Sequence, residues 1–149
     1  MTAVSRGESL RRLEHEMGVL IRRVKRVIGV RARSVHEDLQ PAAYLMLTYL
    51  AETGPLRSSA IAEVFDIDKG AISRQVQHLL DLGLVDRSPD PADGRATLVS
   101  ASPEALRRLA DGIDHRRKWV DERLGDWSSE ELAGFAEALG RYNEALNRP

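Results

Sequence analysis

Several features that would point to particular classes of protein are missing from this sequence. Its 149 residues contain no cysteine, which excludes disulfides, thiolate metal ligands and thiol-based redox sensing. No apolar run approaches the roughly 20 residues that a helix needs to cross a bilayer. The first seven residues, MTAVSRG, lack the apolar core of a secretory signal. We therefore expect a cytoplasmic protein with no membrane partner.

An excess of one charge is absent too. The chain has 22 basic and 23 acidic residues, so its net charge does not indicate a polyanionic partner. The distribution is uneven, however, because residues 1–33 hold nine basic and three acidic side chains while residues 57–95 have a net charge of −2. The basic N-terminal run has two interpretations, a solvated helix face or a set of arginines that help to hold phosphates.

Constellations typical of enzymes or metal sites are not evident in the sequence. No stretch isolates a nucleophile with a base, or a pair of carboxylates. The four histidines, His15, His36, His78 and His115, lack the paired spacing of metal ligands. We expect no enzymatic activity, no metal and no cofactor.

Residues 68–100 carry the most informative pattern that is present. Asp68 is a good helix N-cap, and Gly83 stands where a helix C-terminus favours a residue with positive φ. Between them, one apolar face is formed by Ile72, Val76, Leu79 and Leu80 at helical spacing. The other side of this helix is suited to entering a groove, and it carries Lys69, Gly70, Ser73, Arg74 and Gln77.

The elements predicted on either side of this helix follow the order of a known DNA-binding motif. A short helix near residues 58–65 precedes it, which gives residues 58–82 helix-turn-helix proportions. Two strands, near residues 84–87 and 95–100, follow it and flank the turn Asp90-Pro91-Ala92-Asp93-Gly94. A helix-turn-helix that runs into a β-hairpin is a winged helix-turn-helix.

Longer helices are predicted on both sides of this module. Apolar residues recur at helical spacing from about residue 8 to 33, and Gly29 is expected to mark the end of the regular helix. A second helix opens at Pro41 and stops at Gly54. Ser102-Pro103-Glu104 and the capping box Ser128-Ser129-Glu130-Glu131 open the last two helices. The first and last helices carry more apolar surface than one chain covers easily, so we expect a homodimer.

Together these patterns resemble the MarR family of bacterial transcriptional regulators over nearly the whole chain. The residues that carry the resemblance are Gly54-Pro55-Leu56, Ile61-Ala62, Ala71-Ile72-Ser73-Arg74, Gly83-Leu84-Val85-Asp86-Arg87 and Asp93-x-Arg95. The implied fold is mainly α-helical with a small β-hairpin wing. Residues 1–149 would form one domain, with dimerisation helices at about 8–35 and 103–147 and a winged helix-turn-helix module at about 41–100.

The resemblance implies double-stranded DNA as the partner, with a pseudo-palindromic operator and a nucleoid-associated location in the cytoplasm. Arg74 is the best candidate for a base or adjacent phosphate contact, while Lys69 and Ser73 are expected to grip phosphates. Arg95 on the wing would enter the minor groove, and Asp93 would orient it. The predicted DNA-binding residues are Arg57, Lys69, Gly70, Ser73, Arg74, Gln77, Asp93 and Arg95.

Relatives typically carry a pocket for a small aromatic or anionic effector. Its predicted walls in this chain are His36, Tyr44 and residues of the helix at 105–124, with Arg33 as the partner of an anion. The resemblance thus predicts a dimeric, sequence-specific regulator, most often a repressor, that an effector releases from DNA. The alternative is a winged-helix module that binds another protein and never contacts DNA. The balanced charge favours this alternative, whereas Arg74, Arg95 and the wing turn favour a DNA-binding regulator.

Overall fold

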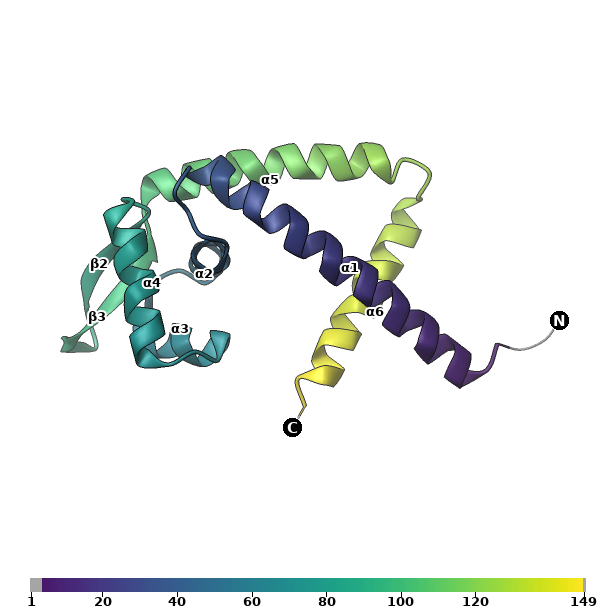
Figure 1. Cartoon of the computed structure of the whole chain (residues 1–149), viewed down its shortest axis with the longest axis horizontal. Coiled ribbons are helices and arrows are strands. Elements are labelled where there is room, and N and C mark those ends of the chain that lie inside the picture. The colour runs from purple at the N-terminus through teal and green to yellow at the C-terminus, as the bar shows by residue number, and fades with distance from the viewer. Residues whose placement is uncertain (1–3, 149) are drawn as a thin grey trace. The chain divides into compact units, whose positions relative to one another are not determined.

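The computed structural model describes residues 4–148, and the described elements follow the predicted order. They are shown in Figure 1: α1 (Arg6–Val35), α2 (Pro41–Thr53), β1 (Leu56–Arg57), α3 (Ser58–Phe65), α4 (Lys69–Asp81), β2 (Val85–Asp90), β3 (Asp93–Ala101), α5 (Pro103–Arg123) and α6 (Ser129–Leu146). The chain divides into two compact units, Met1–Gly112 and Ile113–Pro149.

The first unit contains the winged helix-turn-helix. Helices α3 and α4 pack together, and the β2–β3 hairpin follows α4 (Figure 1). The three strands form an antiparallel sheet in the order β1-β3-β2, in which Leu56 pairs with Val99 and Val85 with Ala101. One hydrophobic core joins these elements to α2, to the last turns of α1 and to the first turns of α5. Its largest fully buried side chains are Met46, Leu47, Leu50, Ile61, Ile72, Leu79, Leu84, Val76 and Val99.

Local signals in the sequence fix most boundaries of these elements. Asp68 caps α4 by accepting a hydrogen bond from the backbone N–H of Ala71, and Gly83 ends it with φ +70°. Pro41 is the first residue of α2, where its missing N–H leaves no intrahelical bond unmade. Ser128 and Glu131 form the predicted capping box of α6. These predictions are confirmed.

Three predictions about elements were wrong or incomplete. Gly29 does not end α1, which continues to Val35, because packing of Ala32 and Val35 in the core keeps the last turn helical. The wing strands extend further than predicted and leave only Pro91 and Ala92 outside them. Strand β1 was missed, since two residues give no periodicity and it exists by pairing with β3.

The second unit comprises the rest of α5 and helix α6. Helix α6 has no buried residue among those described. The indole of Trp127 packs edge-to-face against Phe135, with ring centroids 5.9 Å apart, yet Phe135 remains 57% exposed. Leu146 is likewise 67% exposed, so the second unit does not bury the apolar stripe of α6 by itself.

Candidate nucleic-acid interface

The exposed face of α4 presents the side chains that the sequence predicted. Ile72, Val76 and Leu79 are buried in the core, which fixes the rotation of the helix about its axis. As a result the opposite face is open to solvent, and it carries Lys69, Gly70, Ser73, Arg74 and Gln77. This part of the predicted site is brought together on one helix.

Two of these residues have particular local roles. A Cβ added at Gly70 would lie 3.2 Å from Asp68 Oδ1 and 3.3 Å from Arg74 Nη1. Glycine thus leaves room for the cap carboxylate and for the Arg74 guanidinium, which lies back along the helix. The Gln77 side chain donates to Asp81 Oδ1 at 2.8 Å, so its amide is held by α4 itself in the free protein.

Two aspartates shape the wing loop that carries Arg95. Asp90 Oδ1 accepts the backbone N–H of Ala92 at 2.9 Å, and Asp93 Oδ1 accepts that of Arg95 at 3.1 Å. Both are turns in which an aspartate binds the backbone two residues ahead. Among the ion pairs of the described residues, none joins Asp93 to the Arg95 guanidinium. Asp93 therefore holds the backbone of Arg95, whereas the sequence led us to expect that it orients the side chain.

Arg57 is engaged within the protein. Its Nε donates to Asp90 Oδ2 at 2.6 Å, which links β1 to the end of β2. The pKa of the Asp90 carboxyl lies below its ordinary value because the N–H of Ala92 and the Arg57 guanidinium both donate to it. The importance of Asp90 was not anticipated from the sequence, where it was only one residue of a turn.

Most of the acidic side chains in residues 57–95 accept hydrogen bonds within the protein. Four of the seven acids in this segment accept hydrogen bonds from nearby donors: Asp68 from Ala71, Asp81 from Gln77, Asp90 from Ala92 and Arg57, and Asp93 from Arg95. The hydrogen bonds hold these carboxylates in place, and among these four described side chains only that of Asp90 is paired with a cation. The segment therefore keeps its net charge of −2, and DNA binding depends on where Lys69, Arg74 and Arg95 point.

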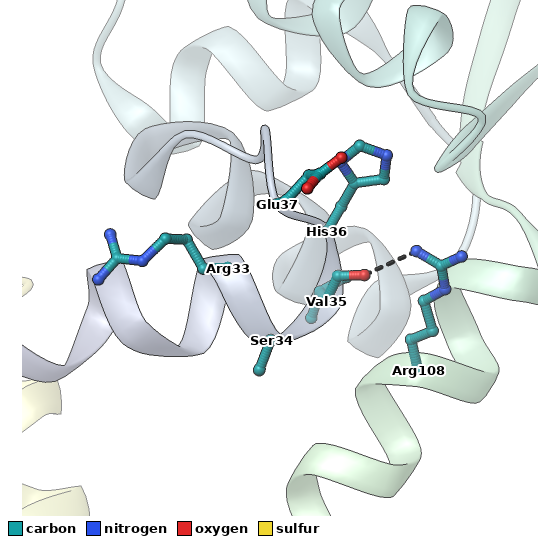
Figure 2. Close-up of a pocket in the computed structure, with 6 residues that line it drawn as sticks. All are labelled: Arg33, Ser34, Val35, His36, Glu37 and Arg108. Atoms are coloured by element: carbon teal, nitrogen blue, oxygen red, sulfur yellow. Dashed lines mark hydrogen bonds between the residues drawn. The ribbon is translucent and has the colours of Figure 1, made fainter.

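A cavity of about 430 Å³ lies at the C-terminal end of α1, where the effector pocket was predicted (Figure 2). Arg33 and His36 are among the residues that line it. Tyr44 is not among its lining residues, because its side chain is buried in the core at 4% exposure. The full lining is Arg33, Ser34, Val35, His36, Glu37 and Arg108.

Arg108 is the cavity residue that the sequence did not single out. Its Nη1 donates to the carbonyl oxygen of Val35 at 2.7 Å and its Nε to Glu104 Oε1 at 2.8 Å. A cation at a helix C-terminus stabilises the helix dipole and satisfies an open carbonyl. Hydrogen bonds from Arg107 and Arg108 lower the pKa of Glu104, so this carboxylate stays ionised beside them.

Comparison of the sequence and the fold with known proteins shows the family to which this chain belongs. A family model described as MarR family matches residues 37–96, which run from the residues before α2 into β3. The chain is 32% identical over 134 residues to the HTH-type transcriptional regulator YxaD of Bacillus subtilis, covering 90% of this chain and 92% of that protein. The chain belongs to the MarR family.

Further similarities agree with this assignment. The HTH-type transcriptional regulator Mb0904 of Mycobacterium bovis is 31% identical over 113 residues, which cover 76% of this chain and 78% of the relative. Among solved structures, a MarR family protein from Bacillus stearothermophilus matches with a TM-score of 0.71 at 19% identity. That match covers 93% of this chain and 98% of the other. Since MarR regulators bind DNA and are not enzymes, this chain is a DNA-binding transcriptional regulator of the winged-helix class.

Two absences among the described residues accompany this result. No helix within residues 4–148 combines the length and the apolar composition that crossing a membrane needs. In the same part of the chain, no group of three or more histidine, aspartate or glutamate side chains could hold a metal ion.

Proposed function

We propose that this MarR-family regulator acts as a homodimer on a pseudo-palindromic operator and represses nearby genes until a small molecule releases it. The observation that carries the proposal is the pairing of an exposed polar and cationic face on α4 with an arginine on a shaped wing loop. Two such units in a dimer would meet half-sites about 10 bp apart, one turn of B-form DNA.

The division of roles between the contact residues follows from their positions. Arg74 lies in the middle of the exposed face of α4, where a side chain in the major groove meets base edges. Lys69 is the first residue of α4, where the helix N-terminus favours phosphate, and Ser73 offers an exposed hydroxyl one turn further along the same face. Arg95, exposed on the wing, suits the negative potential of a narrow minor groove.

The uncovered apolar residues support dimerisation. Apolar side chains that are 36% or more exposed in one chain recur along the terminal helices, whereas α1 and α5 bury only their ends nearest the winged module. A large amount of exposed apolar surface marks a protein interface. The residues are Leu10, Leu13, Leu20, Ile21, Val24 and Val30 on α1, Leu106, Ile113, Trp119 and Val120 on α5, and Leu132, Phe135 and Leu146 on α6.

The cavity at the end of α1 is the proposed effector site. Arg33 supplies a cationic group for a carboxylate or similar anion. Arg108, whose Nε and Nη1 are bound to Glu104 and Val35, lies on another side of the hollow (Figure 2). A ligand that binds one conformation of the dimer better than the DNA-bound one would weaken operator binding by population shift. Calorimetric titration with small aromatic acids, with and without DNA, tests this. Equal affinities in the two titrations would exclude the coupling.

Selection of random duplexes by the purified protein tests the main proposal. We expect a two-fold symmetric motif, and we expect log affinity for it to fall linearly with log salt concentration as bound phosphates release counterions. Recovery of no motif, together with no binding to any duplex at low ionic strength, would contradict the proposal and favour a protein-binding module.

A further inference from the structure

The wing loop has an irregular geometry that isolates Arg95. The β2–β3 ladder is regular as far as the pair Pro89 and Thr97, and the register then shifts so that Asp90 pairs with Asp93. Residues 94–96 consequently have no partner on β2. Arg95 therefore stands on a short arch whose shape depends on contacts other than the ladder.

Asp90 lies at the base of this arch, where it pairs with Asp93, the residue whose carboxylate accepts the N–H of Arg95. One carboxylate oxygen of Asp90 accepts the N–H of Ala92, and the other accepts Nε of Arg57. The side chain of Asp90 is only 11% exposed, whereas that of Arg57 is 43% exposed. The carboxylate is thus enclosed between the turn that it closes and a guanidinium from a distant part of the chain.

Arg57 connects the arch to the helix-turn-helix. It lies on β1, pairs with Leu98 of β3, and directly precedes Ser58, the first residue of α3. The pair Arg57–Asp90 spans 33 positions in sequence, so it joins the start of the helix-turn-helix to the tip of the wing. Nε of the guanidinium is thus engaged with an internal carboxylate in the free protein.

We propose that Arg57 and Asp90 form a positioning pair that holds the wing arch in the shape that presents Arg95 to DNA. In this role Arg57 acts through Asp90 and Arg95, and its contribution to binding does not come from a phosphate of its own. The inference rests on DNA binding by the proposed dimer and assigns a role within it.

Whether Asp90→Asn weakens or strengthens DNA binding separates this role from simple electrostatics. Asp90→Asn retains an oxygen for the N–H of Ala92 but turns an NH₂ group towards Arg57. The substitution therefore breaks the pair with Arg57 and keeps the turn intact. Removing an acid close to DNA would by charge alone strengthen binding. We expect the opposite, a loss of roughly tenfold in affinity, the scale of one lost base-edge or groove contact.

Asp86→Asn is the matched control. Asp86 is an exposed acid on the same strand, and its side chain forms no hydrogen bond or ion pair that is recorded among the described residues. This variant loses the same charge without breaking the pair, so we expect equal or tighter binding. Affinity of Asp90→Asn that equals or exceeds that of Asp86→Asn would overturn the proposal.

A double-mutant cycle provides the second measurement. Affinity for the selected duplex is measured for Arg57→Gln, Arg95→Ala and the double variant, and likewise for Asp90→Asn with Arg95→Ala. If the pair acts through Arg95, Arg57→Gln and Asp90→Asn each weaken DNA binding in the parent protein. In the Arg95→Ala background, each of the two should change the affinity by less than about twofold. Additive losses, with the log–log salt slope reduced by about 1 for Arg57→Gln, would instead make Arg57 a phosphate contact.

Two checks keep the outcomes distinct. The Arg57 side chain is 43% exposed, so we expect the loss of the pair to lower the thermal unfolding midpoint by only a few degrees. If Arg57→Gln unfolds below the temperature of the binding assay, Arg57→Lys takes its place in the cycle. Binding of the parent to the selected duplex tests the proposed function itself. If the parent binds and the cycle is additive, only the positioning role is lost.

Discussion

Arg74 and Lys69 share the exposed face of α4, but we expect them to serve DNA binding in different ways. Arg74→Ala should cost about 1–3 kcal/mol at the operator and relax the sequence preference, because a base contact is lost. Lys69→Ala should weaken operator and scrambled duplexes alike and reduce the salt slope by about 1. Competition binding with both duplexes over a range of KCl concentrations measures both effects. Equal loss on both duplexes for Arg74→Ala would move this residue to the phosphate-contacting group.

The ionisation of Asp90 reports on the wing in the free protein. Folding lowers its pKa, so the charged carboxylate stabilises the folded state at pH above its ordinary pKa, and this contribution is lost as pH falls through the lowered value. Arg57→Gln should raise the pKa of Asp90 partway to its ordinary value, because the Ala92 N–H still donates. NMR titration of side-chain carboxyl carbons checks this.

Glu8 is the internal control for that titration. Its pKa is lowered by hydrogen bonds from the backbone and side chain of Ser5, which Arg57→Gln does not touch. The Glu8 value should therefore be the same in both proteins. An unchanged Asp90 value in the variant would mean that the pair does not form in solution.

Ser102 joins the turn after α4 to the start of α5. Its buried hydroxyl donates to the carbonyl of Gly83 at 2.9 Å and accepts the N–H of Ala105 at 3.1 Å. The sequence predicted the second bond, a helix cap, but not the first. Ser102→Ala should lower the free energy of unfolding by about 1–2 kcal/mol in urea titration, because a cap and a bond to a partly buried carbonyl are both lost. Ser59→Ala, at an exposed helical position, should change it by less than about 0.5 kcal/mol.

At the scale of elements, two glycines have opposite roles. Gly29 lies inside α1, where an added Cβ would be 3.5 Å from Arg33 Nη1, an ordinary contact. Gly29→Ala should raise the free energy of unfolding by about 0.5–1 kcal/mol through higher helix propensity. Gly83 has φ +70°, so Gly83→Ala should lower it by about 1 kcal/mol. Urea unfolding of both variants compares them directly, and stabilisation by both would mean that the turn after α4 does not require positive φ.

The difference between these glycines also shows what could be read from the sequence. Caps and stops are local signals, so Asp68, Gly83, Pro41 and the Ser128 capping box were predicted correctly. The exposed face of α4 followed from periodicity, which assigns one side to the core. Strand β1, the Arg57–Asp90 pair and the link from Arg108 to Val35 depend on residues far apart in sequence. Such contacts leave no periodic pattern, and a glycine inside a helix resembles one that ends it.

At the scale of the whole molecule, the proposed dimer has to account for the exposed apolar side chains of the terminal helices. Ile21 on α1 and Val64 on α3 are both 52% exposed in the single chain, so exposure alone does not distinguish them. Ile21 belongs to a stripe that continues along α1, whereas Val64 lies on the short α3 of the winged module. Only Ile21 should therefore be covered by a second copy.

Ile21→Glu and Val64→Glu form a matched pair that tests this coverage. A glutamate at the interface of two chains would be desolvated without a partner, so Ile21→Glu should weaken dimerisation by at least tenfold, as measured by sedimentation equilibrium. Val64→Glu should sediment like the parent. The variant that loses the dimer should also lose most affinity for the two-half-site duplex while keeping its affinity for a single half-site, since the link between the two recognition helices is what is removed. A parent protein that sediments as a single chain at micromolar concentration would rule out the dimer, and with it the predicted spacing of the operator.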